Sequence, residues 1–236
     1  MRLKIASYNI HAFVGMDGER SVSRIARVVR ALAPDVIALQ EVVFDQREAS
    51  APEPVEMLAE LSGYEAVSAP IQRTDGLTFG NAVLTRLPVA SQRRICLDYG
   101  AHEPRTALEV VLETGLRPLR IVATHLGLRP VERRHQVRTI LSHVAGDEHS
   151  VTVLLGDFNE WFLLGRPLRW LHARFGRGYA VASYPSHYPL LALDRIWAHP
   201  RGALHAFRAY TGGEARVASD HLPVVAEVDV GFDASG

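Results

Sequence analysis

The chain has 236 residues, 47% of them hydrophobic and 22% charged, which is typical of one globular domain spanning residues 1–236. This composition excludes a disordered chain, a collagen-like repeat and a coiled coil. The 26 basic and 26 acidic residues balance to zero formal charge, so no strong overall field attracts nucleic acid or an anionic membrane from a distance.

Cysteine and N-terminal patterns indicate the cellular setting. Cys96 is the only cysteine, which excludes an intrachain disulfide and a thiolate metal cluster. Because it lies in an apolar run, we expect it to be a small core residue. The N-terminal residues lack an apolar leader, and no apolar run is long enough to cross a bilayer. We therefore expect a cytoplasmic protein with no stable membrane insertion and no obligate protein partner.

Apolar periodicity in the first third of the chain predicts a strand, a helix and a second strand. Residues 3–10 have strand character, and residues 21–32 form an amphipathic helix that ends near Pro34. Residues 36–39 are fully apolar, which is typical of a strand buried on both faces. The segment 45–54 is expected to be a surface loop.

Strand and helix patterns continue to alternate through the rest of the chain. A helix begins near Pro130 and ends before Gly146, and a second helix is expected at 164–174. Strands are expected around 82–85, 93–97, 107–113, 120–124, 151–155, 193–198, 203–210 and 224–230. Fully apolar strands and alternating strands both occur, which favours an α/β sandwich of two mixed sheets with helices outside.

Polar residues gather at the ends of several apolar strands. Burying carboxylates and amides there is costly unless they converge on something that stabilises them, and a metal ion with a phosphate would do so. Any one cluster alone is more typical of a turn that caps a strand. The five clusters are Tyr8-Asn9-Ile10-His11, Gln40-Glu41, Thr124-His125, Gly156-Asp157-Phe158-Asn159 and Ser219-Asp220-His221.

These clusters belong to an ordered set of motifs that resembles the endonuclease/exonuclease/phosphatase (DNase I-like) superfamily. A small bacterial subgroup of that superfamily is resembled by Tyr-Pro (184–185), Pro-Leu-Leu (189–191) and Asp-Arg-Ile (194–196), together with HLGLR (125–129). The resemblance implies a four-layer α/β sandwich and hydrolysis of a phosphoester assisted by a divalent cation. The motifs are SYNIH (7–11), LQEV (39–42), GNAVLTR (80–86), THLGL (124–128), GDFN (156–159), LDRIW (193–197) and SDHLP (219–223).

The resemblance also implies a metal site. Glu41 would be the principal metal ligand, with Asn9 beside it and Asp220 nearby. These side chains offer only oxygen atoms, which suits Mg²⁺ or Mn²⁺ better than zinc. The expected cofactor is therefore Mg²⁺ or Mn²⁺.

Catalytic roles follow from the same resemblance. Asp157 would orient or deprotonate the attacking water, and Asn159 would hold a phosphate oxygen. His221 would touch the phosphate or transfer a proton, oriented by Asp194 in a carboxylate–imidazole pair. His125 would contact the side of the site that holds the phosphate.

Further residues are expected to contact the substrate. Arg105 lies where members of this superfamily often place a phosphate-contacting Tyr or Arg, and Asn81 would support the site through hydrogen bonds or cap a turn. Tyr184 and His187 precede Asp194 and would line the mouth of the site. The run 161–164, Trp-Phe-Leu-Leu, would form either an apolar rim or part of the core.

The substrate is not determined by these motifs. Similarity to the bacterial subgroup favours a lipid or small-molecule phosphodiester. The alternative is a DNA or RNA nuclease, which predicts a contiguous arginine surface beside the metal site. We expect the arginines at 129, 133, 134 and 138 to form a solvated helix face instead. A non-catalytic binding protein is disfavoured, because the GDFN and SDH motifs and Glu41 are all retained.

Overall fold

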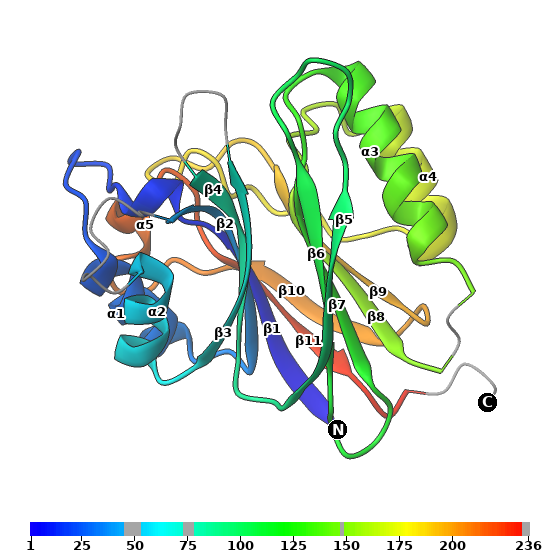
Figure 1. Ribbon diagram of the computed structural model, residues 1–236, viewed down its shortest axis with the longest axis horizontal. Coiled ribbons are helices and arrows are strands. Elements are labelled where there is room, and N and C mark those ends of the chain that lie inside the picture. The colour runs from blue at the N-terminus through cyan, green and yellow to red at the C-terminus, as the bar shows by residue number, and fades with distance from the viewer. Residues whose placement is uncertain (45–52, 73–77, 147–148, 233–236) are drawn as a thin grey trace.

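Two mixed β-sheets pack face to face, with helices on the outer face of each (Figure 1). The computed structural model describes residues 1–44, 53–72, 78–146 and 149–232. Apolar side chains from both sheets, among them Ile5 and Ile121, form the buried layer between them. This arrangement confirms the four-layer α/β sandwich expected from the sequence. Among the residues of these ranges, no helix is long and apolar enough to cross a membrane.

One sheet has six strands in the order β10-β11-β1-β2-β4-β3. Its strands are β1 (Arg2–Asn9), β2 (Val36–Phe44), β3 (Glu65–Gln72), β4 (Thr78–Thr85), β10 (Leu204–Ala209) and β11 (Val224–Asp229). The other sheet has five strands in the order β5-β6-β7-β8-β9. They are β5 (Val89–Cys96), β6 (Thr106–Leu112), β7 (Leu119–His125), β8 (Val151–Asp157) and β9 (Asp194–His199).

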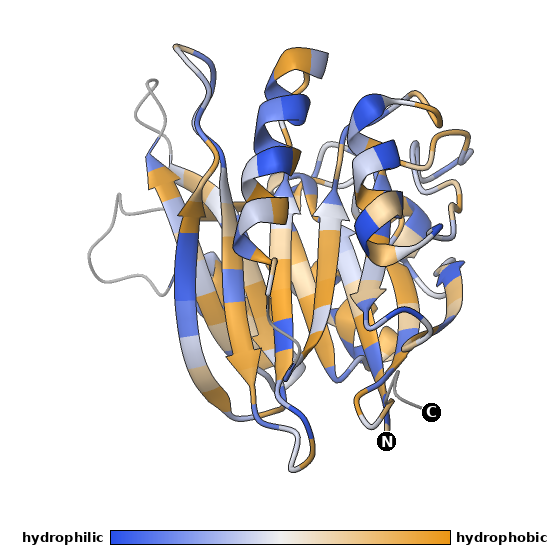
Figure 2. Ribbon diagram, turned by 90° about the vertical axis from the view of Figure 1, so that its right-hand side faces the viewer, coloured by the Kyte–Doolittle hydropathy of each residue, from blue (hydrophilic) through white to orange (hydrophobic). Residues whose placement is uncertain are grey.

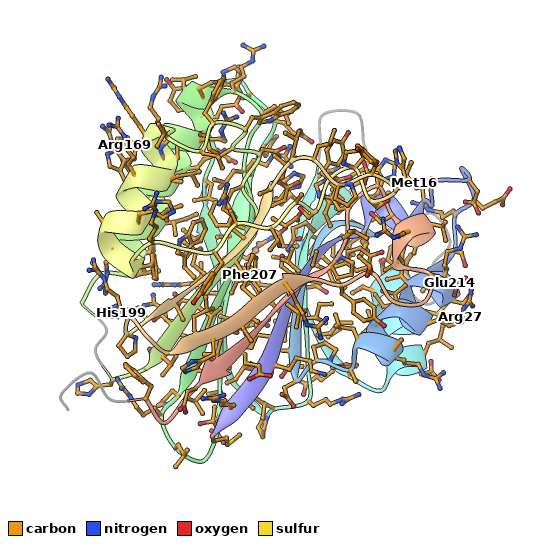
Figure 3. All side chains as sticks on the ribbon, turned by 180° about the vertical axis from the view of Figure 1, so that it is seen from behind. Met16, Arg27, Arg169, His199, Phe207 and Glu214 are labelled. Carbon is orange, nitrogen blue, oxygen red and sulfur yellow. The ribbon has the colours of Figure 1, made fainter. Side chains whose placement is uncertain are left out.

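Each sheet buries its outer face under helices (Figures 1 and 2). On the six-stranded sheet these are α1 (Val22–Leu32), α2 (Pro54–Ser62) and the short α5 (Ala215–Ala218). Glu214, just before α5, forms an ion pair of 2.6 Å with Arg27 of α1 (Figure 3). On the five-stranded sheet they are α3 (Pro130–His143) and α4 (Arg166–Phe175), which face the viewer in Figure 2.

Three sequence predictions need correction. Pro54 is not in a loop but begins α2, since proline is well suited to the first turn of a helix. Residues 45–52 of the expected loop lie outside the described residues. Strand β3 was not expected, because it is an edge strand that contains Pro70. Cys96 is exposed rather than in the core, because side chains alternate along β5 and its neighbour Ile95 takes the face that packs under α3.

Parallel strand pairs in the two sheets bring the polar clusters to one edge of the sandwich. Strands β1 and β2 are parallel and place Asn9 beside Gln40. Strands β7 and β8 are parallel and place His125 beside Asp157, while antiparallel β9 places Asp194 on the other side of Asp157. The carboxyl ends of all four parallel strands therefore meet at the edge opposite the chain termini (Figure 1).

Gly156 makes a close backbone contact at this edge. Its φ is 144°, and a Cβ there would lie 1.8 Å from the carbonyl oxygen of Thr124 on β7. We therefore expect Gly156→Ala to lower the free energy of unfolding by more than about 2 kcal/mol, measured by urea denaturation. Gly231→Ala is the control, because its Cβ would meet only ordinary contacts of 3.5 Å or more. Equal effects of the two variants would contradict this account.

Candidate active site

A cavity of about 360 Å³ opens where the polar strand ends meet. Its lining combines polar side chains with apolar ones such as Ile71, Phe79 and Leu193. Nine of the residues expected at the site from the sequence contribute to this lining: Glu41, Asn81, Arg105, His125, Asp157, Asn159, Tyr184, Asp220 and His221. The structure thus brings residues from seven separate motifs and loops to one place.

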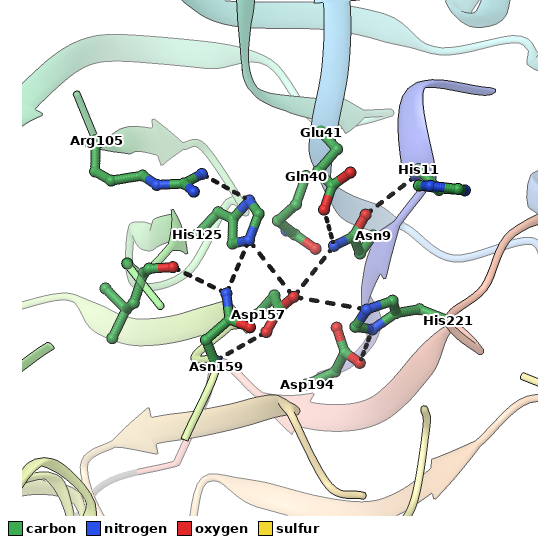
Figure 4. Close-up of polar contacts among 12 residues, drawn as sticks. Asn9, His11, Gln40, Glu41, Arg105, His125, Asp157, Asn159, Asp194 and His221 are labelled. Atoms are coloured by element: carbon green, nitrogen blue, oxygen red, sulfur yellow. Dashed lines mark hydrogen bonds and ion pairs between the residues drawn. The ribbon is translucent and has the colours of Figure 1, made fainter. Parts of the chain in front are cut away.

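Asp157 lies at the centre of the hydrogen-bond network (Figure 4). Its Oδ1 accepts the backbone N–H of Asn159 at 2.9 Å, and its Oδ2 accepts the side-chain amide of Asn9 at 3.1 Å. The same Oδ2 lies 3.7 Å from His221 Nε2. Burial raises the pKa of Asp157 to about 6, with Asp194 adding to the rise and His221 opposing it. Such a carboxylate can accept a proton near neutral pH.

His221 and Asp194 form a buried carboxylate–imidazole pair, the contact that the sequence resemblance implies. His221 Nδ1 lies 2.7 Å from Asp194 Oδ2, and the Ser183 hydroxyl donates to that same oxygen at 2.5 Å. Burial is the largest single influence on the pKa of His221 and lowers it, but the carboxylates around it, Asp194 foremost, raise the pKa to about 10. His221 is therefore a cation beside Asp157 at neutral pH.

His125 is held neutral on the opposite side of Asp157. Arg105 Nη1 lies 3.2 Å from His125 Nδ1, and N–H donors face both ring nitrogens, because the side-chain nitrogen of Asn159 lies near Nε2 and also donates to the carbonyl of Leu126. Burial, with smaller contributions from Arg105 and His221, holds the pKa of His125 well below its usual value. Its Nε2 lies 3.6 Å from Asp157 Oδ2 and 3.0 Å from the side-chain nitrogen of Asn159.

Two carboxylates, Glu41 and Asp220, face the cavity from the side of the six-stranded sheet. A bulge interrupts the pairing of β2 with β4 between Leu39 and Val42, and Glu41 takes a φ of 56°. Such backbone strain is found preferentially at functional sites, and here it accompanies a carboxylate directed into the cavity. Carboxylate oxygens at this position fit a divalent cation such as Mg²⁺ or Mn²⁺.

Asn9 differs from its expected role as a metal ligand. Its Nδ2 donates to Glu41 Oε1 at 2.8 Å as well as to Asp157, and its Oδ1 accepts the backbone N–H of His11 at 3.1 Å. In this arrangement Asn9 braces Glu41 and Asp157 instead of presenting its oxygen to the cavity. The buried atoms of Asp157, Asp194 and His221 also lie within 4.8 Å of one another. However, Asp194 and His221 direct their nearest atoms at each other, which leaves these atoms less free to bind a cation.

The remaining expected site residues differ in their placement. Asn81 is buried on β4 and donates to the carbonyl of Thr106 at 2.9 Å, which links the two sheets beside the cavity. The ring of Tyr184 lies 4.8 Å from that of His221, centroid to centroid. His187 is exposed and is not among the cavity-lining residues, and its backbone carbonyl accepts from Arg216 at 3.3 Å. The structure therefore does not bring His187 to the site.

A buried ion pair next to the site was not predicted from the sequence. Arg133 was expected on a solvated helix face, but it is 1% exposed, and its Nε lies 3.2 Å from Glu160 Oε2. Its Nη1 also donates to the backbone carbonyl of Leu128 at 2.6 Å. The pair therefore joins the loop after β7 to the loop after GDFN. The acidic residue that directly follows GDFN was the available signal, but it had no identifiable partner in the sequence.

Comparison with solved structures supports the same fold. An endonuclease/exonuclease/phosphatase from Beutenbergia cavernae has a TM-score of 0.79 and 26% identity, over 98% of this chain and 72% of that one. A mannosyl-6-phosphatase from Bacteroides thetaiotaomicron has a TM-score of 0.75 and 18% identity, over 96% of this chain and 99% of that one. A humanized TDP2 from D. rerio has a TM-score of 0.73 and 16% identity, over 97% of this chain and 99% of that one.

Comparison of sequences identifies a family. No curated protein matches this chain. The sequence model of the endonuclease/exonuclease/phosphatase family, whose members hydrolyse phosphoester bonds, matches residues 6–221. That match covers the polar clusters from Asn9 to His221, which the two sheets bring to one cavity. From the fold, the converging site and this match, we conclude that the chain belongs to the endonuclease/exonuclease/phosphatase family.

Proposed function

We propose that this protein is a divalent-metal-dependent phosphodiesterase that acts on a lipid or small-molecule phosphodiester. The observation that carries this proposal is the convergence of Asp157, the Asp194–His221 pair and Glu41 on one cavity that also has apolar walls. Phosphoryl transfer to water needs a proton acceptor, positive groups that stabilise the phosphate, and space for the organic part of the ester. The cavity offers each of these.

Each polar residue has a proposed task in the reaction. Asp157 orients the attacking water and accepts its proton, and its raised pKa suits that task. His221, a cation paired with Asp194, donates a hydrogen bond or a proton to the phosphate oxygens. Asn159 and neutral His125 bind phosphate oxygens beside Asp157. Arg105 contacts His125 Nδ1 and adds a positive charge at the cavity wall.

A divalent cation fits the acidic side of the cavity. Glu41 and Asp220 would hold Mg²⁺ or Mn²⁺, and Asn9 would keep the carboxylate of Glu41 in place through its 2.8 Å hydrogen bond. When bound there, the cation would neutralise charge on the phosphate and on the leaving oxygen. Without it, the acidic residues facing the cavity would oppose entry of an anionic phosphate.

The charge balance of the cavity favours a diester over a monoester. Among the described residues, Arg105 is the one arginine that lines the cavity, and Glu103 already pairs with it at 2.8 Å. A phosphodiester carries one negative charge, whereas a monoester carries nearly two at neutral pH. Apolar side chains such as Ile71 and Phe79 would contact the organic groups of the diester.

A nuclease is the second candidate, and one observation favours it. Arg129, Arg166 and Arg169 are exposed on α4 and at the start of α3, and both helices begin near the cavity. A phosphate backbone could lie along such a surface. Among the described residues that line the cavity, however, Arg105 is the one arginine, so this basic surface does not extend into the cavity.

Metal removal tests the proposed reaction. We expect hydrolysis of bis-p-nitrophenyl phosphate with Mg²⁺ or Mn²⁺, its loss in EDTA, and slower hydrolysis of p-nitrophenyl phosphate. Glu41→Gln should lower the diester rate about 100-fold or more, because it removes the charge that would hold the cation. Glu227→Gln, which alters an exposed carboxylate paired with Arg2, is the control. Diester hydrolysis that persists in EDTA would contradict the metal, and a faster monoester rate would contradict the diester preference.

A further inference from the structure

An exposed apolar surface lies at the mouth of the candidate active site. It consists of Leu128, in the loop after β7, and the consecutive residues Trp161, Phe162, Leu163 and Leu164, in the loop before α4, and we call it the apolar rim. All five side chains are exposed, Phe162 to 68% and Leu164 to 81%. Leu128 and Trp161 also line the cavity, so the rim is continuous with the site. Contiguous exposed apolar surface of this kind marks an interaction site.

Hydrogen bonds hold the backbone of the rim so that its side chains point outward. Glu160 Oε1 accepts the backbone N–H of Phe162 at 3.2 Å, and the N–H of Gly165 donates to the carbonyl of Phe162 at 2.8 Å. The buried Arg133–Glu160 pair then ties this loop to the carbonyl of Leu128. The exposure of the apolar rim is therefore built into the fold and does not result from a loose loop.

The charge around the apolar rim is positive, although the whole chain is neutral. From Trp161 to Leu193 the sequence contains no Asp or Glu and four arginines, at 166, 169, 174 and 177. Arg166 and Arg169 lie in the first two turns of α4, directly after the rim, and Arg169 lies at the outer edge of the molecule in Figure 3. Arg129 is exposed beside Leu128. The one acidic residue of α3, Glu132, is buried.

We propose that the apolar rim and its arginines form a docking surface for an anionic lipid bilayer. Consecutive aromatic and aliphatic side chains next to arginines are the combination that binds the interface of such a membrane. The three leucines would add nothing to stacking on nucleic-acid bases, which argues against a nucleic acid as the main partner. A second copy of the chain docking through the same face would bring like charges together.

Docking through the apolar rim would narrow the substrate class of the proposed phosphodiesterase, and this inference rests on the proposed function. A protein docked through the apolar rim would present its cavity to the headgroup layer, where Leu128 and Trp161 belong to both surfaces. The substrate class that fits is then a phosphodiester carried by a lipid in the bilayer. Its headgroup phosphate would reach Asp157 while its acyl part stays in the membrane.

Vesicle binding of the full chain tests the docking surface. The probes are vesicles of phosphatidylcholine alone and of phosphatidylcholine mixed with phosphatidylglycerol. We expect wild type to bind the anionic vesicles more tightly, and Phe162→Ser/Leu164→Ser to lower this binding about tenfold or more. Arg166→Gln/Arg169→Gln should remove the preference for anionic vesicles. Leu116→Ser changes a leucine that is 61% exposed in the turn between β6 and β7, and should bind like wild type.

Several results would overturn the docking surface. The first is a wild-type protein that does not bind vesicles. The second is an equal loss of vesicle binding in Phe162→Ser/Leu164→Ser and in Leu116→Ser. The third is an apolar rim that binds only single-stranded DNA or only a second copy of the chain. Hydrolysis of bis-p-nitrophenyl phosphate, measured on the same samples, should be unchanged in Phe162→Ser/Leu164→Ser, since neither side chain lines the cavity. Vesicle binding by a protein inert toward the diester would refute the proposed function and leave the docking surface intact.

Discussion

Replacing Asp157 by asparagine is expected to lower the rate of diester hydrolysis about 10²- to 10⁴-fold at neutral pH. Asparagine retains the shape of the side chain and can still accept the backbone N–H of Asn159, but it cannot accept a proton from water. The comparison is made as kcat for bis-p-nitrophenyl phosphate at saturating Mg²⁺. A smaller decrease in kcat accompanied by a large increase in KM would instead indicate that Asp157 acts in binding.

The stability of the same variant separates catalysis from folding. Because burial raises the pKa of Asp157 to about 6, above its unfolded value, the ionised carboxylate destabilises the folded protein above that pH. In EDTA at neutral pH, Asp157→Asn should therefore have an unchanged or higher melting temperature. Asp229→Asn is the control. It lies at the end of β11 opposite the cavity and should retain activity. An inactive Asp157→Asn protein that melts earlier would point to misfolding and contradict the proposed role.

Removing one partner of the buried ion pair should have the largest effect on stability. Arg133 and Glu160 are 1% and 3% exposed, so Arg133→Met leaves a buried carboxylate without its cation and the carbonyl of Leu128 without its donor. We expect a loss of about 3–5 kcal/mol in the free energy of unfolding, measured by urea denaturation.

Two further variants test whether this loss comes from the unpaired charge. Arg133→Met/Glu160→Met should recover only part of the stability, because neither member of the pair is left buried alone, but buried Arg195 loses a carboxylate that stabilises its charge. Arg134→Met, at the next position on α3, is half-buried and should change stability by about 0.5 kcal/mol or less. A double variant as unstable as Arg133→Met would show that the unpaired charge of Glu160 does not determine the effect.

The sequence carried enough information to predict the layers of the fold and the residues at the cavity. Asp157 and Glu41 could be identified because each follows an apolar run directly, a pattern that depends only on local sequence. Helix α2 and strand β3 were missed, because Pro54 suggests a loop and Pro70 interrupts a strand pattern. The exposure of Cys96 follows from which face of β5 is covered, and that depends on the packing of α3, which is distant in sequence.

Contacts between residues distant in sequence explain the other differences between the predicted and the observed site. Arg133 is buried because Glu160, 27 positions later in the sequence, reaches it across two loops. Asn9 turns its amide nitrogen toward Glu41 and Asp157 because this nitrogen has two N–H donors and can donate to a carboxylate from each sheet. His187 lies outside the cavity although Tyr184, three positions earlier, lines it. No spacing rule in the sequence distinguishes these cases.

The hydrogen bond from Asn9 to Asp157 has a consequence for how activity is acquired during folding. It joins a strand of one sheet to a strand of the other across 148 positions of sequence, and Ser219 reaches the carbonyl of Asn9 across 210. Neither sheet alone contains both Glu41 and Asp157. Contacts between residues so distant in sequence form late, since closing long loops costs entropy before the contact stabilises them. A folding intermediate with only one sheet formed would therefore be catalytically silent, and recovery of activity after denaturation would report the docking of the two sheets.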